Sequence, residues 1–103
     1  MQLAELKQTL ANLSRSLDGT GPQMENREVM LLANVTIADL DKLSTSHRDN
    51  HAIVGAAIRL LRQAGRALIQ GKRDTAAQIF LKVSRELPEE LPESNWAGGA
   101  GRN

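Results

Sequence analysis

Two histidines four residues apart have the spacing that could support metal chemistry. His47 and His51 could place both imidazoles on one face of a helix, with Asp49 between them. A helical zinc enzyme needs a glutamate directly after the first histidine, and this position holds Arg48, which repels a cation. The chain has no cysteine, which excludes disulfides and thiolate-ligated metals. We therefore interpret the pair as a solvated helix start and expect no metal and no cofactor.

Four carboxylates near the end of the printed sequence could suggest acid–base chemistry; they belong to Glu86, Glu89, Glu90 and Glu93. Catalysis needs a shielded pocket and a perturbed pKa. We expect these groups on an exposed helix end and the segment that follows it. No nucleophile–base constellation accompanies them, so we predict no catalytic residues and a protein that is not an enzyme.

Basic residues recur at helical spacing in the middle of the chain. Arg59, Arg62 and Arg66 are three and four residues apart, so they share one helix face, which we name the arginine face. Lys72 and Arg73 continue it at a turn, and Lys82 and Arg85 extend it. The face predicts a docking surface for an acidic protein or for phosphates. The alternative is a solvated face partly paired with Glu5, Asp39, Asp41 or the acidic C-terminal segment.

The charge is unevenly distributed although the whole chain carries only +1. Residues 1–47 have a net charge of −2, residues 48–85 of +6 and residues 86–103 of −3. The basic middle is therefore flanked by acidic ends. No spacing typical of a helix-turn-helix supports sequence-specific reading of DNA.

Trp96 is the one tryptophan, and it follows Leu91 in a segment rich in proline and then glycine. Tryptophan is enriched at the energetic centres of interfaces. Leu91 and Trp96 therefore either fold back on the helices or anchor a partner.

The first helix is predicted over residues 2–17 by leucines at alternating steps of three and four. We name these residues the leucine stripe: Leu3, Leu6, Leu10, Leu13 and Leu17. A helix this short is marginal alone, so the stripe must pack on the rest of the chain or on another protein. The second outcome includes a homo-oligomer formed through the stripe.

The second helix is predicted over residues 23–44, after a turn that contains Gly19, Gly21 and Pro22. Its apolar face is Met30, Ala33, Ile37 and Leu40, widened by Val29, Leu32 and Leu43. Residues 29–37 could also form a strand, but a lone strand would have no pairing partner.

The third and fourth helices are predicted over residues 49–70 and 74–87, joined by a turn at Gly71, with Asp74 as N-cap and Pro88 as terminator. The third helix presents an apolar face made of Ile53, Ala57, Leu60, Ala64, Ala67 and Leu68. Gly55 and Gly65 each weaken a helix by up to about 1 kcal/mol relative to alanine. A close helix crossing would explain both glycines.

Residues 56–88 resemble one tetratricopeptide repeat, a helix pair with small residues at its crossing. The matching positions are Ala64, Gly71, Ala76, Phe80, Val83 and Pro88. Leu60 and Ala67 stand where the family has Trp and Tyr, and Ala64 replaces its Gly. No second copy is found, and a single repeat cannot bury its own faces. The resemblance implies a helical hairpin that needs neighbours and offers a peptide-binding surface.

These patterns predict an all-α, compact four-helix domain over residues 1–88 and a flexible tail over residues 89–103. Aromatic residues make up 2% of the chain, so leucine, isoleucine, valine, methionine and alanine must build the core. We expect a cytoplasmic protein without signal peptide or membrane span. Its predicted function is a non-enzymatic interaction module (an adaptor, chaperone-like subunit or inhibitor) docked on a larger protein. The alternative is a nucleic-acid-associated regulator. The predicted partner-binding residues are Arg59, Arg62, Arg66, Lys72, Arg73, Leu91 and Trp96.

Overall fold

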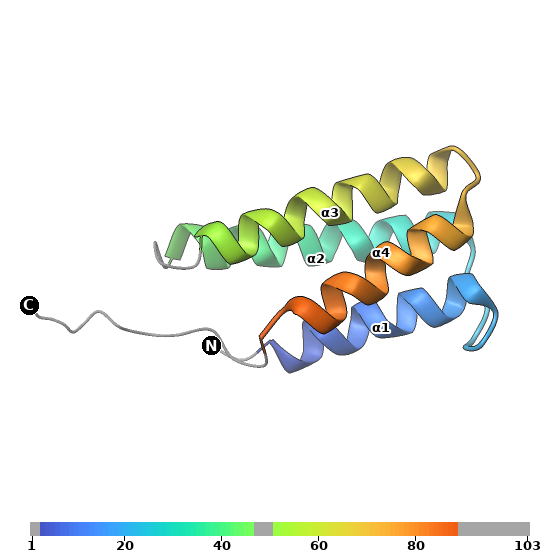
Figure 1. The fold of residues 1–103 in the computed structure, drawn as a ribbon, viewed down its shortest axis with the longest axis horizontal. Coiled ribbons are helices and arrows are strands. Elements are labelled where there is room, and N and C mark those ends of the chain that lie inside the picture. Colours follow the sequence, from blue (N-terminus) through green and yellow to red (C-terminus); the bar gives the residue numbers. More distant parts are fainter. Residues whose placement is uncertain (1–2, 47–50, 89–103) are drawn as a thin grey trace, which may run out of the picture.

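The computed structural model describes residues 3–46 and 51–88 of the chain, and these form four helices and no strand (Figure 1). The helices are α1 (Ala4–Asp18), α2 (Asn26–Ser46), α3 (His51–Ile69) and α4 (Arg73–Glu86). The predicted all-α, four-helix fold class is confirmed. Residues 29–37 lie inside α2, so their alternative interpretation as a strand is wrong.

Consecutive helices run in opposite directions, and the four form an up-and-down bundle (Figure 1). α4 lies between α1 and α3 and packs against both, and α2 packs on the other side of α3. α1 and α2 barely touch, although they are neighbours in sequence. The bundle is therefore least closed between its first two helices.

The leucine stripe of α1 packs on α4 of the same chain. Leu3, Leu10, Leu13 and Leu17 are buried, and Leu6 is partly buried. The prediction that the stripe packs internally is confirmed. A homo-oligomer formed through the stripe is wrong, because α4 already covers it within one chain.

Two serine hydroxyl groups join α1 to α4 across this interface. The Ser14 hydroxyl donates to the Ala77 carbonyl at 2.8 Å, and the Ser84 hydroxyl donates to the Lys7 carbonyl at 3.0 Å. Both serines are buried, so the bonds replace water at positions where an unpaired hydroxyl would be costly. The leucine spacing alone did not predict these polar links.

Glycines end α1 and α3 in the left-handed conformation, Gly19 with φ of 88° and Gly71 with φ of 77°. After α3, Lys72 donates its backbone N–H to Ala67 at 2.8 Å and Gly71 donates to Leu68 at 3.0 Å, which is a Schellman motif. The Lys72 carbonyl then accepts the N–H of Ala76 at 3.1 Å. Lys72 thus caps α4, and the prediction of Asp74 as N-cap is wrong because the motif starts the helix earlier.

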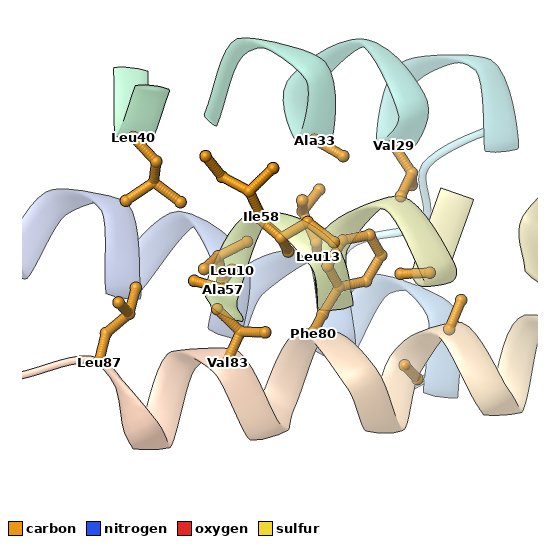
Figure 2. Packing of buried hydrophobic residues seen from close by; sticks show 14 of the residues in the cluster. Leu10, Leu13, Val29, Ala33, Leu40, Ala57, Ile58, Phe80, Val83 and Leu87 are labelled. Carbon is orange, nitrogen blue, oxygen red and sulfur yellow. The ribbon is translucent and has the colours of Figure 1, made fainter. Parts of the chain in front are cut away.

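The core is continuous along the bundle and built almost without aromatic rings. Figure 2 shows Val29, Ala33 and Leu40 of α2 pointing into the interior, where Phe80, Val83 and Leu87 point back from the α4 side. Phe80 is fully buried and is the largest such side chain. The small residues Ala57, Ala64 and Ala67 of α3 are buried as predicted.

Two predicted core positions lie at the surface instead. Leu32 of α2 is exposed, as are its neighbours Leu31 and Val35. Ile53 of α3 is also exposed. The prediction gave both helices wide apolar faces, but α2 packs tightly only against α3, so its outer apolar residues face solvent.

Candidate functional site

The arginine face lies on the outer surface of α3. Arg59, Arg62 and Arg66 are all exposed. Within residues 3–46 and 51–88, no hydrogen bond or ion pair holds any of their three guanidinium groups, so the predicted pairing with Glu5, Asp39 or Asp41 is not formed. The face therefore presents cations that are not neutralised by the described part of the domain.

A groove of about 250 Å³ runs between α2 and α3 beside these arginines, and we name it the arginine-rimmed groove. Its lining includes the apolar side chains of Met30, Ile37 and Leu61, which we call its floor, and the two cations Arg62 and Arg66. Its complete lining is Met30, Ala33, Asn34 and Ile37 from α2 with Leu61, Arg62, Gly65, Arg66 and Ile69 from α3. The groove thus combines an apolar floor with two cations that no residue within 3–46 and 51–88 neutralises.

Gly65 keeps the groove open. A Cβ atom at this position would meet nothing within 4 Å, so no neighbouring helix approaches it. The same holds for Gly55. The prediction that a close helix crossing explains both glycines is therefore wrong. The buried alanines of α3 face the neighbouring helices instead.

Ile69 ends α3 at one edge of the groove and is 74% exposed, the highest value among the exposed large hydrophobic residues. An apolar side chain stabilises the fold only when it is buried, so the exposed Ile69 side chain contributes little to the stability of the domain. Ile69 extends the apolar floor to the surface.

The two basic residues of the turn, Lys72 and Arg73, lie in different environments. Lys72 is exposed, whereas Arg73 is half-buried and donates from Nη1 to the Asn26 side-chain oxygen. That bond ties the start of α4 to the start of α2. Arg73 thus has a structural role, and only Lys72 of the two has a side chain that stays at the surface.

Several residues named in the sequence analysis lie outside the part of the chain that the structure describes. Leu91 and Trp96, like His47 and Asp49, lie outside the described residues. Among residues 3–46 and 51–88, no group of three or more histidine and acidic side chains could hold a metal ion. None of the four helices is long and apolar enough to cross a membrane.

Sequence reasoning identified the arginines but missed the groove beside them. Met30 and Ile37 were predicted on the apolar face of α2, and both are only partly buried against the core. Gly65 follows Arg62 by three residues and directly precedes Arg66, and Ile69 follows one turn later. A glycine among arginines on a helix was the available signal for a surface hollow.

Comparison of the chain with protein-family models, with curated proteins and with solved structures gives no match. The α3–α4 hairpin itself is present, with Ala64, Ala76 and Phe80 buried at its crossing. The tetratricopeptide resemblance stays a prediction beyond that hairpin. Function must accordingly be argued from the surface of the bundle.

Proposed function

We propose that this protein is a non-enzymatic interaction module that docks on a larger protein through the arginine-rimmed groove. The partner contributes a segment with apolar and acidic side chains, the apolar ones entering the groove and the carboxylates meeting Arg62 and Arg66. The proposal includes the cytoplasmic location expected from the cysteine-free sequence.

The observation that carries the proposal is that Arg62 and Arg66, which have no partner among the described residues, lie beside apolar side chains in one groove. Arginine pairs with carboxylates in a bidentate geometry and is enriched at interface hot spots. Met30 and Ile37 are only partly buried and Ile69 is exposed, so the groove offers apolar area that an isolated charge cannot use. Methionine also adapts its shape to different apolar partners.

The apolar floor favours a protein partner over a nucleic acid. A phosphate backbone is bound through cations, and such binding weakens steeply as salt concentration rises. A bound phosphate backbone would contact the arginine face but would leave the apolar floor of the groove and Ile69 exposed. A protein segment with both kinds of side chain covers the whole groove.

The test is capture of partners from a nuclease-treated lysate by the wild-type chain and by Gly65→Gln, with quantification by mass spectrometry. The new glutamine side chain would occupy the groove. The fold should tolerate it, because nothing lies within 4 Å of a Cβ atom at position 65. We expect Gly65→Gln to lose the specific partner by at least about tenfold, equivalent to about 1.4 kcal/mol. Arg62→Glu with Arg66→Glu should lose the same protein.

Gly55→Gln is the matched control, because Gly55 lies on the same helix with the same open surroundings but outside the groove. It should capture the partner as the wild type does. Equal loss in both glycine variants would contradict the proposal. Retention of nucleic acid alone, with steep salt dependence and no effect of Gly65→Gln, would favour the regulator hypothesis instead.

A further inference from the structure

A second groove, of about 210 Å³, lies between the start of α3 and the end of α4, and we name it the α3–α4 groove. It is lined by Ile53, Ala56, Ala57 and Leu60 of α3 and by Val83, Glu86 and Leu87 of α4. Glu86 is its one charged lining residue. Ile53 is 39% exposed and Leu60 is only partly buried, so the groove leaves apolar area uncovered.

The chain leaves α4 at the edge of this groove. Leu87 both lines the groove and is the last residue of the helix end, where its N–H donates to the Val83 carbonyl at 3.0 Å. Its backbone is already extended, with φ of −68° and ψ of 136°. Pro88 follows and cannot continue the helix. Residues 89–103 are thus tethered directly to the groove.

The tethered segment carries two large apolar side chains, Leu91 and Trp96. Leu91 follows Leu87 by four residues and Trp96 by nine, so an extended chain reaches about 14 Å and about 30 Å respectively. The groove extends about 10 Å along α3 from Ile53 to Leu60, at the helical rise per residue. Both contour lengths exceed the extent of the groove along α3.

A tethered occupant has an advantage over a separate molecule. A short flexible linker holds its end at an effective concentration in the millimolar range. Closing so short a loop costs little entropy compared with losing the translational freedom of a free partner. The segment also carries Glu89, Glu90 and Glu93, which have the same sign as Glu86 in the groove, so its apolar side chains rather than its charges would hold it there.

We propose that residues 89–96 of the same chain dock in the α3–α4 groove, with the Trp96 side chain in the groove and Leu91 packed beside it. This inference is independent of the proposed function, because it concerns a different groove and needs no partner. It assigns Trp96 to the domain itself, so the arginine-rimmed groove is left as the surface open to other proteins.

Trp96 is the one tryptophan of the sequence, so intrinsic fluorescence at its excitation wavelength reports its surroundings alone. In the full chain we expect emission shifted to the blue of the denatured protein and weak quenching by acrylamide. Ile53→Asp places a carboxylate in the groove at an exposed position that does not form the core. It should move the emission and the quenching to the values of the denatured chain while circular dichroism stays helical.

Ile69→Asp is the matched control, because it makes the same change at an exposed isoleucine of α3 outside this groove. Its emission should equal that of the wild type. Wild-type emission already at the denatured position would overturn the proposal, as would equal shifts in both variants. A blue shift that disappears on dilution would also overturn it, because a second copy would then be the occupant.

Discussion

Single hydroxyl groups decide how α1 meets α4. Ser14 and Ser84 lie inside an otherwise apolar interface and each donates to a carbonyl of the facing helix. Hydrogen bonds are directional, whereas leucine packing allows helices to slide along and rotate about each other. The two serines therefore fix the register of α1 on α4.

Replacing Ser14 by alanine should lower the free energy of unfolding by about 1 kcal/mol, the net value of a typical buried hydrogen bond. The measurement is chemical denaturation followed by circular dichroism. Thr9→Ala is the control, because the Thr9 hydroxyl donates to the backbone carbonyl of Glu5, within α1 itself and at an exposed position. It should change stability by less than about 0.5 kcal/mol. Equal effects of the two changes would contradict a role for Ser14 between helices.

The carboxylate of Asp18 ends α1 with two hydrogen bonds from Thr20. The Thr20 hydroxyl donates at 2.6 Å and its backbone N–H at 2.9 Å, and these bonds hold the pKa of Asp18 below its ordinary value of 3.8. Because the folded pKa is the lower one, the stabilising contribution is complete above pH 3.8 and is lost as the pH falls through the folded pKa.

Thr20→Ala removes the hydroxyl bond, which is the larger cause of the shift. We expect the pKa of Asp18, measured by NMR titration of its carboxyl carbon, to rise toward 3.8 in this variant. The backbone bond remains, so the return should be incomplete. An unchanged pKa would show that the hydroxyl does not hold the carboxylate in solution.

At the scale of the helices, the sequence predicted that there are four helices but not which of their faces are covered by neighbouring helices. The steps of three and four between Leu3 and Leu17 define a helix and its buried face without knowledge of the rest of the chain. The apolar face of α2 was predicted too wide, because the sequence does not reveal that α1 barely touches it. A groove depends on which helices are neighbours, so Gly65 could signal a hollow on α3 but not that α2 forms its other side.

A pair of leucine truncations separates the buried face of α1 from the outer face of α2. Leu10 is fully buried, whereas Leu31 is 64% exposed, and both lie inside helices. Leu10→Ala should cost about 2–5 kcal/mol through lost burial and the cavity left behind. Leu31→Ala should change the free energy of unfolding by less than about 0.5 kcal/mol. Comparable losses would mean that the outer face of α2 is covered in solution.

The whole molecule keeps its strongest apolar stripe inside and leaves separate apolar sites outside. The leucine stripe is covered by α4, so it does not contribute to an interface between copies. Ile53 and Ile69 lie toward opposite ends of α3, and Leu31 and Val35 lie on α2. Leu31 and Val35 share one face of α2, because they are four residues apart, whereas the two isoleucines are separated along α3.

A stable interface between two copies usually buries at least about 1,000 Å². Because only five large apolar side chains of the described residues are exposed, we expect no such interface, and the melting temperature should not change over a hundredfold range of protein concentration. For an obligate dimer the melting temperature rises with concentration, since association and folding are coupled. Differential scanning calorimetry across that range, with sedimentation at the two extremes, makes the measurement. A concentration-dependent melting temperature that Val35→Glu abolishes would instead identify the outer face of α2 as a contact between copies.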